Sequence, residues 1–155
     1  MRLRIAVLVT VMASATAVVR VGAAGPALAV ACVIGIPAAY VFSHVSRRRD
    51  DTWLKAVVAV GLLLAFANFL AAVAGLGTGN LGSVQVPLAA LFLWVQILHS
   101  LHLPARRDLL FSVASSVALI ALAGVLSTSL DLVPHLVVWL AAFVASLVLA
   151  HNSEL

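Results

Sequence analysis

The stretch "WLKAVVAVGLLLAFANFLAAVAGL", residues 53–76, contains one charged side chain, Lys55, and one amide, Asn68, in an otherwise apolar run. A helix rises about 1.5 Å per residue, so about 20 apolar residues cross the roughly 30 Å hydrocarbon core of a bilayer. The run is long enough to do so, and it lacks the polar face that a surface helix of a soluble protein carries. Residues 53–76 therefore predict a membrane-spanning helix.

The rest of the chain has the same composition. Of its 155 residues, 65% are hydrophobic and 9% are charged, whereas soluble domains carry roughly a quarter charged residues. One small water-soluble core cannot bury this much apolar surface. The sequence predicts an all-α fold, a polytopic integral membrane helix bundle that forms a single domain over residues 1–155.

Six apolar stretches approach the length of a membrane span, and we expect about six transmembrane helices. They are residues 5–24, 26–45, 53–76, 84–101, 109–126 and 132–150. The first is the shortest, because Arg4 and Arg20 enclose only about 15 mainly apolar residues. A signal peptide cleaved near Ala23 or Ala24 is the alternative interpretation, but Pro26 at once begins another full-length span, which favours a retained helix.

Basic residues gather in alternate loops of this predicted zigzag. They are Arg2 and Arg4 before the first span, Arg47, Arg48, Arg49 and Lys55 between the second and third, and Arg106 and Arg107 between the fourth and fifth. The loops on the other side contain no lysine or arginine, and Arg20 is the exception to the pattern. Because basic loops stay on the cytoplasmic side, we expect both termini in the cytoplasm and the chain in the cell membrane.

The same basic residues do not predict a nucleic-acid partner. Arg47, Arg48 and Arg49 form one short cluster that is followed directly by Asp50 and Asp51. Such a cluster offers little surface for binding phosphates. The expected partner is the lipid bilayer.

Asn68 and Gln96 are the best examples of polar side chains within the predicted spans, where polar groups are costly. We expect each to hydrogen-bond to a neighbouring helix; the alternative is that they line a transport path. Small residues also recur every fourth position in two spans and predict close helix contacts. They are Ala27, Ala31, Gly35 and Ala39 in one, and Ala67, Ala71 and Gly75 in the other.

Residue types that carry catalysis or bind metals are scattered along the chain. Cys32 is the one cysteine, so the sequence predicts no internal disulfide and no thiol pair. His99 and His102 are three residues apart, but a zinc site needs more ligands than two. No serine or cysteine has an evident base and orienting partner. The sequence predicts neither a catalytic site nor a cofactor nor a metal.

The stretch "LHSLHLPARRDLLF", residues 98–111, predicts a corner at the membrane surface. Pro104 ends the preceding helix, and Arg106 and Arg107 reach anionic headgroups. Asp108 is expected to cap the next helix by accepting hydrogen bonds from its first amides.

The stretch "ARRDLLFSVASSVALIALAGVL", residues 105–126, follows an apolar helix that ends in histidine and leucine. It resembles the arginine-arginine-aspartate turn in the N-terminal membrane domain of bacterial transglutaminase-like membrane proteins, and the multi-span layout resembles that domain over the whole chain. The matching positions are Arg106, Arg107, Asp108, Leu109 and Phe111. The resemblance implies that a further span and an extracytoplasmic domain, which catalyses with cysteine, histidine and aspartate, follow such a membrane domain. This sequence contains none of that catalytic domain.

Three classes of function follow from these observations. The leading hypothesis is a non-catalytic membrane anchor or scaffold that holds a C-terminal or separate extracytoplasmic domain, or other membrane subunits. The alternative is a small transporter or channel subunit, for which Asn68, Gln96 and the glycine-rich loop at residues 75–82 are the supports. An intramembrane enzyme would need reactive side chains that converge at one depth, and none are evident.

Overall fold

The computed structural model describes residues 2–45, 52–76, 81–103 and 106–152, and all regular structure in them is helical, as the sequence predicts. The α-helices are α1 (Arg2–Arg20), α2 (Pro26–Val30), α3 (Ile36–Val45), α4 (Thr52–Gly75), α5 (Gln85–Ser100), α6 (Arg106–Leu126) and α7 (Val133–Asn152). A π-helical segment, Ala31–Gly35, joins α2 to α3, and short 3-10 turns, Leu81–Val84 and Leu130–Leu132, precede α5 and α7.

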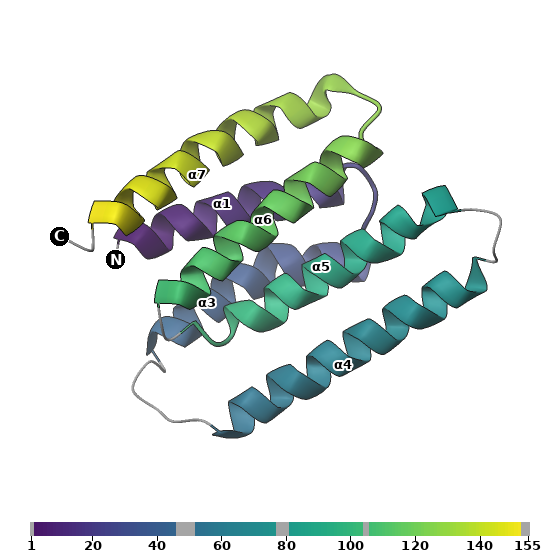
Figure 1. Ribbon diagram of the computed structural model, residues 1–155, viewed down its shortest axis with the longest axis horizontal. Coiled ribbons are helices and arrows are strands. Elements are labelled where there is room, and N and C mark those ends of the chain that lie inside the picture. The colour runs from purple at the N-terminus through teal and green to yellow at the C-terminus, as the bar shows by residue number, and fades with distance from the viewer. Residues whose placement is uncertain (1, 46–51, 77–80, 104–105, 153–155) are drawn as a thin grey trace.

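The chain runs back and forth through an elongated bundle, and its two termini lie at the same end (Figure 1). Five helices are long and apolar enough to cross a membrane, namely residues 2–20, 26–45, 52–75, 107–126 and 130–152. The sixth predicted span, residues 84–101, is a shorter α-helix of 16 residues in the structure. It is shorter because the apolar run begins within the 3-10 turn and the α-helix ends at Ser100. Hydropathy alone does not distinguish a 3-10 turn from a turn of α-helix.

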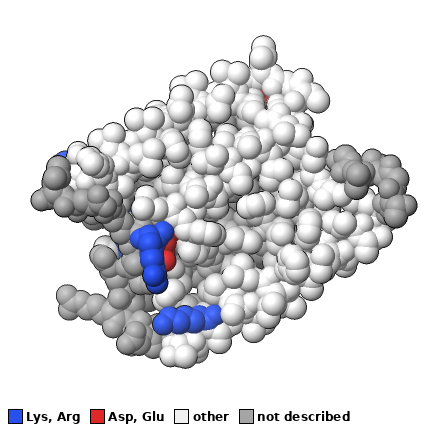
Figure 2. Space-filling view, in the orientation of Figure 1, with Lys and Arg blue, Asp and Glu red and all other residues white. Residues whose placement is uncertain are grey.

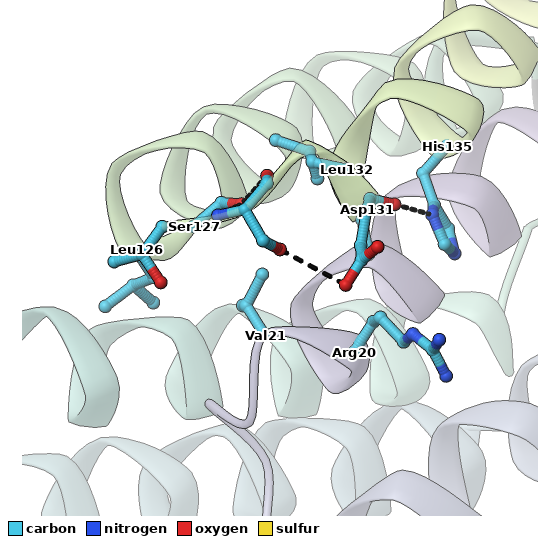
Figure 3. Close-up of a pocket in the computed structure, with 10 residues that line it drawn as sticks. Arg20, Val21, Leu126, Ser127, Asp131, Leu132 and His135 are labelled. Carbon is cyan, nitrogen blue, oxygen red and sulfur yellow. Dashed lines mark hydrogen bonds between the residues drawn. The ribbon is translucent and has the colours of Figure 1, made fainter.

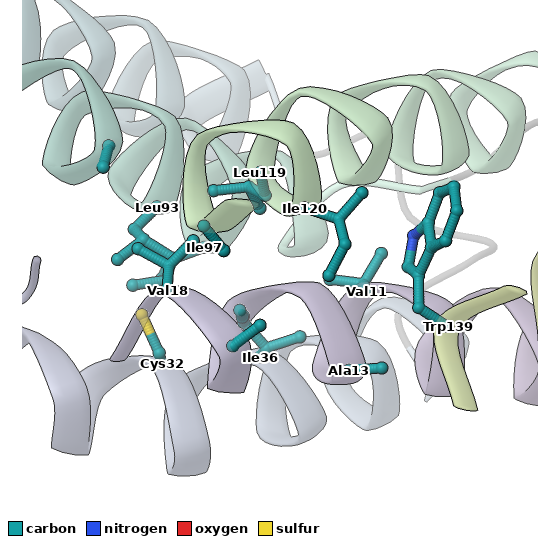
Figure 4. Close-up of a cluster of buried hydrophobic side chains, with 14 of the residues drawn as sticks. Val11, Ala13, Val18, Cys32, Ile36, Leu93, Ile97, Leu119, Ile120 and Trp139 are labelled. Carbon is teal, nitrogen blue, oxygen red and sulfur yellow. The ribbon is translucent and has the colours of Figure 1, made fainter. Parts of the chain in front are cut away.

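Helix α1 lies at the centre of the core. It packs mainly against α6 and α7, and its alanines and valines on these sides are fully buried. Figure 4 shows Val11 of α1 near Ile120 of α6 and Trp139 of α7, and Val18 of α1 near Leu93 and Ile97 of α5. Residues 2–20, the segment that the signal-peptide alternative would remove, therefore form the core of this structure.

Helix α4 lies at the edge of the bundle, next to α5 (Figure 1). Leu54 is its one buried residue, and the helices approach closely at Gly61, where a Cβ atom would lie 2.9 Å from Cδ2 of Leu98. The predicted contact stripe of Ala67, Ala71 and Gly75 is exposed. The expectation that this stripe packs against another helix is wrong for the described part of the chain, because α4 turns a different face towards α5.

The π-helical segment lies directly before Pro37. A proline inside a helix lacks the N–H group that bonds to the carbonyl four residues earlier, and its ring collides with that carbonyl. A π-helical turn widens the backbone at such a place and lets the helix continue. The backbone irregularity that an internal proline imposes is thus spread over Ala31–Gly35.

Candidate functional site

Apart from Arg20, the basic residues of the described chain gather at one end of the bundle. Helices α1, α4 and α6 begin at the end where both termini lie (Figure 1), and these helix starts contain Arg4, Lys55 and Arg107. Figure 2 shows blue side chains at this end of a face that is otherwise almost uncharged. Helix starts that are far apart in the sequence therefore lie at the same end of the bundle. Arg47, Arg48 and Arg49 lie outside the described residues, and of Arg106 the structure gives only its place as the first residue of α6.

At this end, the corner between α5 and α6 is held by two other helices. Leu103 is fully buried, and its N–H donates to Oγ of Ser43 in α3 at 3.0 Å. Its carbonyl oxygen accepts from Nη2 of Arg4 in α1 at 2.6 Å. The sequence analysis missed Ser43 and assigned Arg4 only to topology, because hydropathy does not show which helices are neighbours.

Asp108 lies in the first turn of α6, as its third residue. The sequence places Asp108 directly before this helix, whereas α6 begins at Arg106 and has Asp108 inside its first turn. That Asp108 caps the helix stays a prediction. Its carboxylate still lies where the helix dipole favours negative charge. Oδ1 is 3.9 Å from Nε of Arg107, whose side chain is 91% exposed, so this ion pair contributes little.

His99 packs beside this turn. Its ring centroid is 4.6 Å from that of Phe111, and Nε2 lies 3.0 Å from the carbonyl oxygen of Asp108, to which a protonated Nε2 donates. This hydrogen bond of His99 is therefore to the backbone of Asp108 and does not involve its carboxylate. No group of three or more histidine, cysteine or acidic side chains in the described ranges is arranged to hold a metal ion.

Gln96 is fully buried between α5 and α6. Its Oε1 accepts a hydrogen bond from the hydroxyl of Ser115 in α6, and its Nε2 lies 3.5 Å from Oγ of Ser100 one turn later in α5. Oγ of Ser115 also lies 3.0 Å from the carbonyl oxygen of Ser112. The amide thus joins two neighbouring helices, as the sequence analysis expects of it.

Two more polar contacts join α7 to the core. Nε1 of Trp139 donates to Oγ of Ser116 in α6 at 3.1 Å, and Oγ of Ser146 shares a 3.2 Å hydrogen bond with Oγ1 of Thr10 in α1. All of these hydroxyls also donate to backbone carbonyls of their own helices or lie within reach of them, at 2.6–2.9 Å. Single hydroxyls in apolar helices carry no sequence signal for their partners, so these pairs were not predicted.

Asn68 is on the exposed side of α4. It lines an apolar groove of about 310 Å³ together with Trp94 and Leu98 of α5. Its amide makes no hydrogen bond to any other residue that the structure describes. The expected bond to a neighbouring helix of the same chain is therefore not formed.

The opposite end of the bundle holds a polar pocket of about 190 Å³ (Figure 3). Arg20, from the end of α1, lines this pocket together with Asp131 and His135, which precede and begin α7. Oγ of Ser129 donates to Oδ2 of Asp131 at 3.2 Å, and Nδ1 of His135 lies 3.3 Å from the Asp131 carbonyl oxygen. The arginine that breaks the basic-loop pattern thus lies near an acidic side chain. The sequence analysis missed this grouping because its members belong to two distant loops.

The chain matches no protein-family model, no curated protein and no solved structure. The buried polar side chains, Gln96 foremost, bond to one another across helices, which stabilises packing. The polar pocket brings together the guanidinium of Arg20, the carboxylate of Asp131 and the imidazole of His135, which can bind a polar group. Oγ of Ser129 is hydrogen-bonded there to the carboxylate of Asp131 rather than to the imidazole.

Proposed function

We propose that the chain is a non-catalytic membrane anchor or scaffold domain, a helix bundle that crosses the cell membrane with both termini in the cytoplasm. The observation that carries this proposal is the environment of Gln96. Its amide is fully buried and is bonded to serines of α5 and α6. An amide that lines a transport path would instead face water or the transported species.

The proposed orientation is supported by the collection of basic residues at one end of the bundle. Arg4, Lys55 and Arg107 belong to helix starts at that end, beside both termini. Arginine and lysine near the ends of spans remain on the cytoplasmic side during insertion. Arg20 is the exception and lies at the other end, where it lines a pocket with Asp131.

We also propose, from the resemblance of Arg106, Arg107 and Asp108 to the turn in transglutaminase-like membrane proteins, that this domain holds an extracytoplasmic domain or other membrane subunits at the membrane. The structure supports an anchoring role in one respect. The corner that carries the resemblance is fixed to α1 and α3 through Leu103, so it is part of the packed bundle.

The proposal is tested by asking whether water reaches the level of Gln96. In a Cys32→Ala background, Ser115→Cys should remain unlabelled by a charged thiol reagent in native membranes and become labelled after denaturation. Thr128→Cys, in the exposed turn between α6 and α7, is the matched control and should be labelled at once.

Labelling of Ser115→Cys in the folded protein would overturn the scaffold proposal and favour a transporter or channel subunit. A separate measurement checks the membrane placement. The chain should stay in the membrane fraction after an alkaline carbonate wash, and release by the wash would contradict the proposal that it spans the bilayer.

A further inference from the structure

The feature that carries a further inference is the amide of Asn68 on the outer side of α4. This helix has 24 residues, and Asn68 lies about 7 Å from its midpoint along the axis, so a helix that crosses the bilayer places it inside the hydrocarbon layer. Lipid tails offer no hydrogen-bond partner, and a polar group left without one is costly there. No described residue of this chain supplies a partner.

Except for Leu64, the residues that share a face of α4 with Asn68 are small and leave room for another helix. We define the Asn68 face as the strip of α4 that follows the helical repeat on either side of this residue, formed by Gly61, Leu64, Asn68, Ala71, Ala72 and Gly75. All of them except Gly61 are exposed, and Gly61 is half-buried against α5. Small side chains allow two helix backbones to approach closely, which is how helices associate in lipid.

We propose that the Asn68 face binds the Asn68 face of a second copy of this chain, with the two Asn68 amides hydrogen-bonded to each other. Copies inserted with the same topology run parallel, so a two-fold axis along the membrane normal brings each residue to its own counterpart at the same depth. A carboxamide carries both donors and an acceptor, and is therefore complementary to itself. A different protein would need a polar side chain at the matching depth.

The position of α4 in the bundle leaves this face accessible. The helix packs chiefly against α5 and has only Leu54 buried, so a second copy can approach without displacing a helix of its own chain. The groove between α4 and α5 opens beside Asn68 and is lined by Trp94 and Leu98. A large side chain of the approaching helix can pack into it.

The inference rests on the membrane placement proposed above, but it is independent of whether the chain is a scaffold or a transporter. The carbonate wash tests placement without reference to association. A chain that resists the wash and remains monomeric would therefore refute the dimer and leave the membrane placement standing.

Disulfide cross-linking in native membranes locates the interface. In the Cys32→Ala background, Ala72→Cys on the Asn68 face should form a covalent dimer upon mild oxidation. Phe66→Cys is the matched control, because Phe66 is also exposed but points away from this face. Equal cross-linking of both variants, or of neither, would overturn the proposal.

The contribution of the amide is measured by energy transfer between labelled copies in liposomes as the protein-to-lipid ratio is lowered. Asn68→Leu should weaken dimerisation by about 5- to 30-fold, the range for a polar bond between model helices in a membrane. Asn68→Gln should preserve most of the dimer because it keeps a carboxamide.

Folding of Asn68→Leu is checked by circular dichroism and thermal unfolding. Because this side chain is exposed and makes no bond within the described chain, the monomer should be unaffected. An unchanged dimer in a folded Asn68→Leu protein would refute the inference. So would a wild-type chain that stays monomeric at every ratio and cross-links through Ala72→Cys to a different protein.

Discussion

Replacing Gln96 by leucine should destabilise the folded bundle by only about 1 kcal/mol, although the side chain is fully buried. The amide engages two hydroxyls, that of Ser115 in α6 and that of Ser100 in α5. Side-chain hydrogen bonds between membrane helices contribute about 0.6 kcal/mol on average and rarely more than about 1.7 kcal/mol. The bond to Ser115 is of this kind, whereas the bond to Ser100 lies within α5, so the loss of both amounts to about 1 kcal/mol.

Two structural details keep this cost small. Oγ of Ser100 still donates to the backbone carbonyl of residue 96 at 2.6 Å, and Oγ of Ser115 still has the carbonyl of Ser112 at 3.0 Å. No buried donor is left without a partner, and leucine fills nearly the same volume as glutamine. Gln96→Ala is the matched contrast. It adds a cavity and should cost about 2–5 kcal/mol, the range for large-to-small substitutions in cores.

The assay is equilibrium unfolding in mixed micelles at rising denaturing-detergent content, followed by circular dichroism. Gln96→Leu, Ser115→Ala and their double variant form a cycle whose coupling free energy should be about 0.6–1.7 kcal/mol. The pair Gln96→Leu and Ser146→Ala is the control. It should be additive within about 0.5 kcal/mol, since Ser146 bonds to Thr10. A coupling of zero, or a loss of about 4 kcal/mol or more in Gln96→Leu, would refute this reasoning.

Three further predictions concern the two ends of the bundle. Ser43→Ala should cost about 1–3 kcal/mol in the same unfolding assay, because the buried N–H of Leu103 loses its acceptor, and an unchanged midpoint would show that this bond does not hold the corner. Asp108→Asn should cost only about 0.3–1 kcal/mol, the contribution of a charge near a helix start, and a loss of several kcal/mol in that assay would contradict this role. In a cysteine-free background, an impermeant thiol reagent added to intact cells should label Thr128→Cys and spare Thr52→Cys; the reverse pattern would invert the proposed topology.

The placement of the helices could be predicted from the sequence because crossing a bilayer imposes a length and an apolar composition on each one. The run at residues 53–76 corresponds to α4, Thr52–Gly75, almost residue for residue. The ends of the helices are predicted less accurately, because hydropathy does not report backbone geometry. The start of α5 and the start of α6 both differ from expectation, and the second difference moves Asp108 from before the helix into its first turn.

The partners of the polar side chains could not be predicted. Gln96 and Asn68 are both amides in long apolar runs, yet one lies in the core and the other on the outer surface. The difference arises from which face of each helix its neighbours cover, and that is decided by the packing of the whole bundle. The same reason explains why Arg4 and Leu103, 99 residues apart, were not paired.

The central place of α1 also bears on how the chain is made. Its main partners, α6 and α7, begin at Arg106 and Val133, so the ribosome synthesises the first helix long before the helices that cover it. At about 5–20 residues per second, α1 waits roughly 5–25 s for α7. During that time Thr10 lacks Ser146, its hydrogen-bond partner in α7. A translation product that stops before α6 therefore exposes the surface that is most deeply buried in the finished protein, and we expect cellular quality control to recognise and degrade it.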